Sequence, residues 1–169
     1  MNLSYFRHKF QDAKFKERLL LTLTYDDPLL CVVSSHLMLE RMLEIWIEAY
    51  SDIPCLLDNA QLSFSQKLKM CKNCKLPTEI ASVISKINKF RNTLSHKFEM
   101  SDLNDLETKE LLELIQKIEF NSSLDDIHEF SINSPKGMIK IKDASNNQKV
   151  VFAALIVISA MFQSTDKLG

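Results

Sequence analysis

Glycine is almost absent from this chain, and its scarcity limits the possible folds more than any other feature. Only Gly137 and Gly169 occur among 169 residues, together with four prolines. Rossmann turns, glycine-rich phosphate loops and all-β folds need glycine at tight turns, where the backbone adopts positive φ. We therefore expect an all-α fold, and the length fits a single domain over residues 1–169.

Apolar residues recur at the spacing of amphipathic helices. This pattern predicts a bundle of about five to six helices, over residues 4–24, 29–50, 63–74, 77–98, 102–119 and 147–163. Asp27 and Ser101 are the predicted caps of two of them, and the helix over 29–50 is apolar nearly all round, which is typical of a central helix. A small β-hairpin is predicted near 130–142, around the turn residues Asn133 to Gly137.

The longest apolar stretch predicts a core helix and no membrane span. It runs from Val150 to Phe162, 13 residues with Ser159 inside it, whereas a span needs roughly 20. The N-terminal sequence has no apolar signal core. We therefore expect a cytoplasmic protein whose four cysteines are reduced thiols.

Charge is unevenly distributed although the net charge is only −1. Residues 67–97 hold eight basic residues and one acid, whereas residues 99–129 hold ten acids and two lysines. One interpretation is that two neighbouring solvated helix faces attract each other. The other is a local phosphate-binding face, with Lys86, Lys89 and Lys97 as its RNA-binding residues.

The sequence Arg91-Asn-Thr-Leu-Ser-His96, late on the predicted helix 77–98, contains the residue types for metal-free RNA cleavage. Histidine can take and give a proton near neutral pH, and arginine grips phosphate and stabilises transition-state charge. Asn92 could orient either group. On a helical wheel, however, Arg91 falls within the apolar stripe and His96 about 140° away. Either the helix is distorted, or a second helix or a second subunit completes the site.

These residues resemble the signature of HEPN domains, in which Arg and a polar residue are followed by His after three further residues. Residues 33–98 are similar to the mannitol-repressor-like branch of that family, through Leu39-Glu40, Leu43-Glu44, residues 62–68 and residues 84–92. The resemblance implies an all-α, HEPN-type bundle that forms a homodimer. It also implies a metal-independent endoribonuclease of the toxin or phage-defence kind, with Arg and His of two protomers meeting at the interface.

The resemblance further implies RNA as a partner, an antitoxin or a regulatory protein as another, and no cofactor or metal. One residue departs from the pattern. Toxins paired with nucleotidyltransferase antitoxins usually have Tyr two residues after the His, where this chain has Phe98, so that mode of neutralisation is not expected. Two alternatives stay open: a non-catalytic dimeric regulatory or interaction module, and a nucleotide-binding module anchored by Arg91.

Two further patterns are given structural interpretations. Cys71 and Cys74 form a single CxxC pair, which supplies half of the four ligands that a structural zinc needs, so we expect them to end an amphipathic helix. His36 and Glu40 share a helix face at a spacing of four, which is more often a polar patch than half of a metal site.

Overall fold

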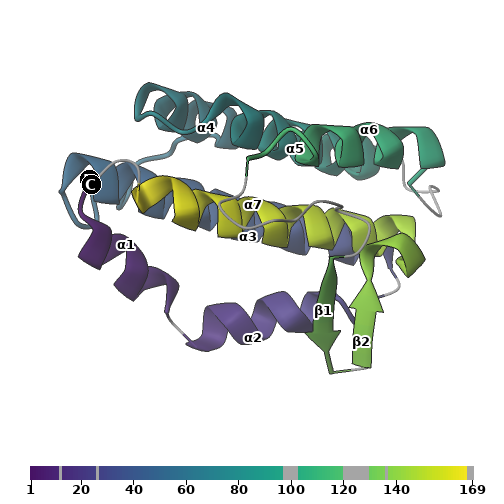
Figure 1. Cartoon of the computed structure of the whole chain (residues 1–169). Coiled ribbons are helices and arrows are strands. Elements are labelled where there is room, and N and C mark those ends of the chain that lie inside the picture. Colours follow the sequence, from purple (N-terminus) through teal and green to yellow (C-terminus); the bar gives the residue numbers. More distant parts are fainter. Residues whose placement is uncertain (12, 26, 97–102, 120–129, 136, 167–169) are drawn as a thin grey trace.

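The protein folds into an α-helical bundle with one small antiparallel hairpin (Figure 1). The structure is a computed structural model that describes residues 1–11, 13–25, 27–96, 103–119, 130–135 and 137–166. Among these, the side chains of residues 13–16, 19, 95 and 96 are not described. The all-α class and the hairpin between the last two helices are thereby confirmed, with seven α-helices in the described ranges instead of five to six.

The elements follow in chain order, with bounds close to those predicted except at the N-terminus and at the sixth helix. They are α1 (Leu3–Phe10), α2 (Ala13–Thr22), α3 (Pro28–Ser51), α4 (Phe64–Asn73), α5 (Thr78–His96), α6 (Asp105–Ile115), β1 (Ser131–Ser134), β2 (Gly137–Lys140), the 3₁₀ helix η2 (Ile141–Asp143) and α7 (Asn146–Asp166).

The prediction of one helix over 4–24 is wrong, because the chain bends after Phe10 into two helices. The bend lets α1 pack across the end of the bundle. The Phe6 ring contacts Trp46 of α3 at 5.9 Å and Phe162 of α7 at 5.0 Å, and Phe10 contacts Phe162 at 4.1 Å. A straight helix could not place these aromatic rings in the core and also run along α3, so tertiary packing overrides the local periodicity.

Local capping explains where several helices begin. Asp27 accepts a hydrogen bond from the Leu30 amide and precedes Pro28, which confirms the predicted start of α3. Ser63 and Gln66 form a reciprocal capping box at the start of α4. Asn104 caps α6, which is shorter than the predicted helix over 102–119, and the predicted cap Ser101 lies outside the described residues.

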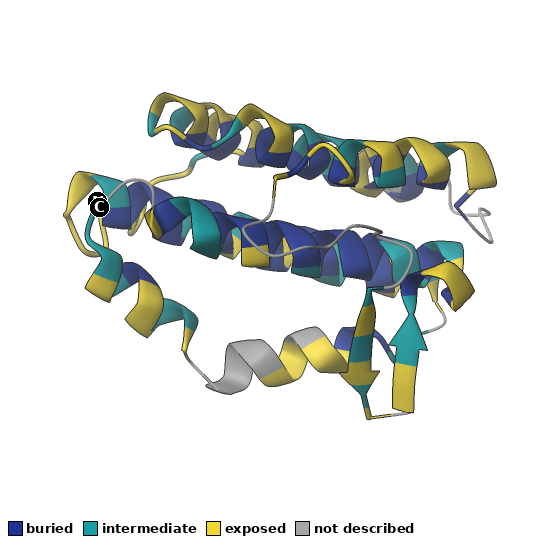
Figure 2. Ribbon diagram, in the orientation of Figure 1, coloured by how far each residue is buried: buried dark blue, intermediate teal, exposed yellow. Residues whose placement is uncertain are grey.

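The helices form layers around α3 and α7 (Figure 1). α4, α5 and α6 lie along one side of the α3–α7 pair, and α1 and α2 lie along the other. The buried side chains line the surfaces between these layers (Figure 2). The prediction of α3 as a central helix is confirmed, since it contacts α1, α2, α4, α5 and α7.

The apolar stretch from Val150 to Phe162 lies within α7 and packs into the core of one chain, as predicted for a core helix. Val150, Val151 and Phe152 are fully buried, as are Ala153, Ala154 and Val157. By length and hydropathy α7 could also cross a membrane, but 61% of its most apolar window is buried in the structure. Core helices of soluble proteins have the same properties, so this is only a weak indication of a span.

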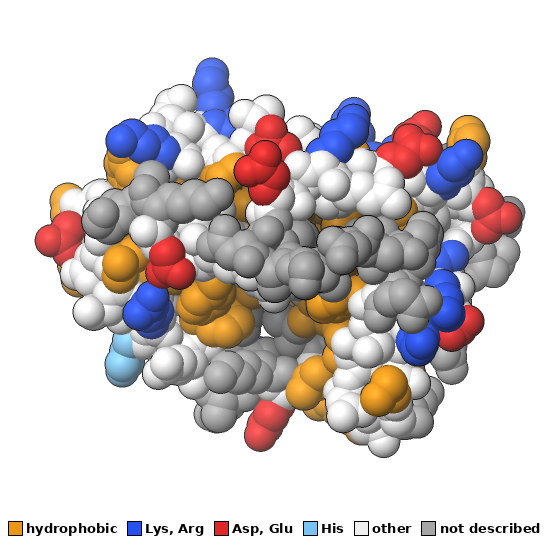
Figure 3. Space-filling view, viewed as in Figure 1, with side chains coloured by type: hydrophobic (Ala, Val, Ile, Leu, Met, Phe, Trp, Pro, Cys, Tyr) orange, Lys and Arg blue, Asp and Glu red, His pale blue; other side chains and the backbone are white. Residues whose placement is uncertain are grey.

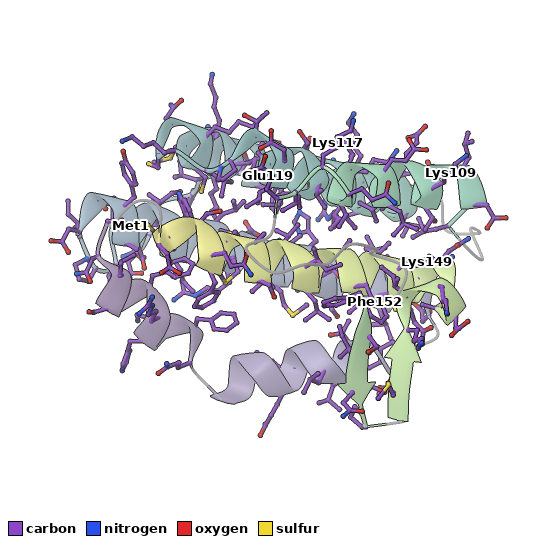
Figure 4. All side chains as sticks on the ribbon, viewed as in Figure 1. Met1, Lys109, Lys117, Glu119, Lys149 and Phe152 are labelled. Carbon is purple, nitrogen blue, oxygen red and sulfur yellow. The ribbon has the colours of Figure 1, made fainter. Side chains whose placement is uncertain are left out.

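The hairpin packs against α7 by its apolar residues. Phe152 of α7 lies where the helix passes the hairpin (Figure 4), and its ring contacts Phe130 at 6.1 Å, edge to face. Ser134 pairs with Gly137, whose φ of 112° explains why one of the two glycines is found here.

Candidate functional site

Arg91 lies where the apolar face of α5 meets a polar pocket. Ile87 and Leu94, one turn before and after it, are buried, whereas Arg91 itself is exposed. The pocket, with a volume of about 290 Å³, lies between α3, the start of α4 and α5. The guanidinium therefore does not enter the apolar core as its place on the wheel suggested, because the neighbouring helices supply polar side chains at this level.

The side chains around this pocket, here called the Arg91 pocket, come from three elements. Its lining residues are His36 and Glu40 of α3, Ser63, Phe64 and Ser65 at the start of α4, and Asn88, Arg91 and Asn92 of α5. The α3 residues that line the pocket precede its α5 residues by more than forty positions in sequence, so the bundle, and not local sequence, forms the pocket.

The predicted pair Arg91 and Asn92 is in direct contact. Nη1 of Arg91 donates a hydrogen bond to Oδ1 of Asn92 at 3.2 Å, and both side chains are exposed. An amide oxygen that accepts from a guanidinium restricts the rotation of that guanidinium. This contact is of the kind expected for an orienting Asn92, although the role itself stays a prediction.

His36 forms one wall of the Arg91 pocket and is only 6% exposed. Its ring stacks on Phe64 with centroids 4.2 Å apart, and its Nε2 lies 3.0 Å from Oδ1 of Asn88. Burial lowers the pKa of His36, and the nearby Arg91 and Lys67 act in the same direction, against the hydrogen bond to Asn88 and the charge of Glu40. The imidazole is therefore neutral at physiological pH.

Lys67 compensates the negative charge of Glu40 at the pocket. Nζ of Lys67, on α4, contacts Oε1 of Glu40 at 2.8 Å and Oε1 of Glu44 at 2.7 Å, with only 10% of the Lys67 side chain exposed. Burial alone would raise the pKa of Glu44, but hydrogen bonds from Lys67 and Arg41 outweigh it and the pKa is lowered. The Glu44 carboxylate is thus held ionised by the cations beside it.

The two described members of the predicted RNA-binding lysines, Lys86 and Lys89, do not line the Arg91 pocket. Lys86 forms an ion pair with Glu110 of α6, and its Nζ lies 5.2 Å from the centre of the Phe90 ring. Lys89 is exposed, and its charge acts on the same Glu110 carboxyl, whose pKa is lowered chiefly by the hydrogen bond from Lys86. Lys97 lies outside the described residues.

The basic and acidic segments therefore do attract each other, through the contact of α5 with α6. On the face in Figure 3, cationic and anionic side chains alternate along the layer of α4, α5 and α6.

The predicted catalytic histidine, His96, is the last residue of α5, and its side chain is among those not described. The backbone position keeps it more than one turn beyond Arg91 on the same helix. How its imidazole lies relative to the Arg91 pocket is therefore outside the described part of the molecule.

The CxxC pair joins α4 to α3. Sγ of the buried Cys71 donates to the Leu43 carbonyl at 3.3 Å, and the Cys74 carbonyl accepts from Nε1 of Trp46 at 3.0 Å. Burial raises the pKa of both thiols. Within the described ranges, no group of three or more His, Cys, Asp and Glu side chains could hold a metal ion.

Sequence reasoning did not assign six of the lining residues to the site, His36, Glu40 and Asn88 among them. The spacing of His36 and Glu40 marked a shared polar face, and Asn88 precedes Arg91 by three residues, so each pair was visible locally. That the two pairs face each other depends on the packing of α3 against α5, which no local pattern encodes.

Comparison of the chain with protein-family models, with curated proteins and with solved structures found no match.

Proposed function

We propose that this protein is a metal-independent endoribonuclease of HEPN type, in which Arg91 binds phosphate and His96 transfers protons. The observation that supports it best is the position of Arg91: an exposed guanidinium at a polar pocket, in contact with Asn92. A toxin or phage-defence role in the cytoplasm, with an antitoxin or regulatory protein as partner, belongs to the same proposal and follows from the resemblance.

The residue types suit a transesterification that needs no metal. A base removes the proton of a ribose 2′-hydroxyl, and the 2′-oxygen then attacks the adjacent phosphorus. The bond to the 5′-oxygen breaks, and that oxygen takes up a proton as it leaves. The products are a 2′,3′-cyclic phosphate and a 5′-hydroxyl. A histidine suits either proton transfer, and Arg91 would stabilise the negative charge that accumulates on the phosphoryl oxygens.

A homodimer is part of this proposal because Arg91 and His96 lie about 140° apart on an ideal helix. A second protomer could bring its own His96 beside Arg91. The apolar residues 150–162 give no separate support for a dimer, since α7 is buried within one chain. Light scattering at tens of micromolar should give the mass of a dimer, and a clean monomer would contradict the shared site.

Cleavage of RNA by purified protein, with and without EDTA, tests the proposal. We expect cleavage to persist in EDTA, to leave a 2′,3′-cyclic phosphate and to fail on a fully 2′-deoxy substrate. His96→Ala should lower the rate by a factor of about 10² to 10⁴, the typical value of one proton-transfer group. Melting curves of each variant separate loss of activity from loss of fold.

The contrary result is equally informative. If wild type cuts no RNA, or if His96→Ala cuts as fast as wild type, the nuclease proposal is wrong. The non-catalytic regulatory or nucleotide-binding module then replaces it, with the Arg91 pocket as a binding site only.

A further inference from the structure

Asn88 and Arg91 reach the Arg91 pocket from the same face of α5. They are three residues apart, which makes them neighbours on the surface of a helix. Both line the pocket, together with Asn92. Asn88 is half-buried and Arg91 is exposed, and because both line one pocket, a group bound by the guanidinium there would lie beside the Asn88 amide.

His36 fixes which end of the Asn88 amide is available. An amide oxygen only accepts hydrogen bonds, so the 3.0 Å contact with Oδ1 requires that Nε2 of His36 carries the proton. The His36 ring is itself held by its stack on Phe64. With Oδ1 occupied, Nδ2 of Asn88 retains two N–H donors, and it has no hydrogen-bond partner within the described residues.

We propose that Asn88 is a second phosphate-binding group of this site, and that His36 is a positioning residue that turns its amide donors toward the ligand. The ligand is a phosphodiester group of an RNA strand, bound between Nδ2 of Asn88 and the guanidinium of Arg91. The identity of this ligand rests on the proposed nuclease function, whereas the donor arrangement does not.

The balance of donors and charges favours an anion. Oδ1 of Asn92 is occupied by Arg91, so its amide nitrogen adds donors beside the guanidinium. Glu40 is the one carboxylate among the lining residues, and Lys67 pairs with it. A phosphodiester, which carries one negative charge and only accepts hydrogen bonds through its free oxygens, matches such a set.

The first experiment measures binding apart from cleavage. A fluorescein-labelled, fully 2′-deoxy oligonucleotide, which lacks the nucleophile, is titrated with full-length protein and followed by fluorescence anisotropy. Asn88→Asp keeps an acceptor for His36 but replaces the amide donors with a carboxylate. We expect it to weaken binding by about 10- to 100-fold, as for loss of one hydrogen bond to a charged group.

Asn73→Asp is the matched control. Asn73 is exposed at the last residue of α4, the opposite end of that helix from the pocket, and its substitution makes the same change in net charge. We expect binding within about twofold of wild type, because exposed charges more than about 10 Å away are largely screened at physiological salt. Should Asn88→Asp fail to fold, Asn88→Ala replaces it, with an expected loss of about tenfold.

Variants of His36 test the positioning role. His36→Gln retains a side-chain N–H near the position of Nε2 and should bind within about threefold of wild type. His36→Phe keeps an aromatic ring on Phe64 but loses the donor, and it should weaken binding by about 5- to 10-fold. In an Asn88→Ala background, His36→Phe should have no further effect, because the two residues act through one contact.

Two outcomes overturn the inference. One is binding by Asn88→Asp that matches Asn73→Asp, including the case in which wild type does not bind at all. The other is an equal loss from His36→Phe with and without Asn88, which would give His36 a purely structural role. Cleavage assays run in parallel separate this failure from that of the nuclease proposal. A wild type that binds the oligonucleotide through Asn88 but cuts no RNA refutes the nuclease alone.

Discussion

The two polar faces of α5 differ in how their charges are matched, although both lie in one basic segment of the sequence. On the α3 side, Arg91 borders a pocket whose carboxylate, Glu40, already has a cation in Lys67. On the α6 side, Lys86 is paired with Glu110. A run of basic residues therefore does not make a single phosphate-binding face, because the partner helices decide which cation can meet a ligand.

The largest expected effect is a difference in RNA cleavage rate between variants on the two faces of α5. Arg91→Ala should lower RNA cleavage by about 10² to 10³, as for loss of one donor that stabilises transition-state charge. Lys86→Ala and Lys89→Ala should each change the rate by less than about threefold, since their effect is limited to general attraction of RNA. Single-turnover cleavage rates of the three variants measure this. Equal losses of cleavage rate in Arg91→Ala and Lys86→Ala would instead support a single basic face that binds phosphate.

The next effect concerns stability on the α3 side. Lys67→Met removes the cation shared by Glu40 and Glu44 and leaves two carboxylates partly buried next to each other. We expect a loss of about 2–3 kcal/mol in the free energy of unfolding, below the value for a fully buried pair because these carboxylates are partly exposed. Urea denaturation gives the value.

Lys86→Met is the matched control on the α6 side. Its partner Glu110 is exposed, so the change in unfolding free energy should be much smaller than for Lys67→Met. If the two methionine variants lose similar free energies of unfolding, the two faces of α5 do not differ in how much their ion pairs stabilise the fold.

The pH dependence of stability is a smaller effect and also belongs to the α3 side. The pKa of His36 is lowered in the folded protein, so the unfolded chain binds its proton more readily. Stability should be fully present above the unfolded pKa of about 6.5 and fall as the pH drops below it, by at most about 1.4 kcal/mol per pH unit. Glu40, Lys67 and Arg91 are the charged groups that face this imidazole.

Urea denaturation at pH 7.5 and at pH 5.5 would measure this slope, and His36→Gln should flatten it. The lowered pKa of Glu44 affects stability only at more acidic pH. A dependence of stability on pH that persists in His36→Gln would therefore come from groups other than His36 and Glu44, and it would contradict this prediction.

The smallest effect is the response of the α6 side to salt. The Lys86–Glu110 pair is solvent-exposed on its Glu110 side, so any difference in melting temperature between wild type and Lys86→Met should vanish in about 1 M salt, where the Debye length is about 3 Å. The Lys67 contacts are better shielded, and the Lys67→Met difference should persist.

Much of the fold could be predicted from local chemistry. Asp27 with Pro28 marked the start of α3, and the sequence around Gly137 marked the hairpin, because caps and tight turns depend on a few neighbouring residues. The break between α1 and α2 could not be predicted in this way. It depends on the fit of Phe6 between Trp46 and Phe162, which are distant in sequence.

The candidate site shows the same division. Arg91 and Asn92 were found because they are adjacent, and the structure places them in contact. Asn88 and His36 were missed as partners because their hydrogen bond joins positions 52 residues apart. Lys86 was assigned to RNA because its charge is visible in sequence, whereas its ion pair with Glu110 appears only once α6 packs on α5.

Trp46, which donates to the Cys74 carbonyl, is the one tryptophan of the chain and is fully buried. Its ring contacts Phe6 of α1, and its Nε1 donates a hydrogen bond to the carbonyl of Cys74 at the end of α4. Its intrinsic fluorescence therefore reports whether these two helices remain packed on α3. A variant of the Arg91 pocket that keeps the native emission spectrum has kept this part of the bundle assembled, whereas a shift to longer wavelength signals solvent entry.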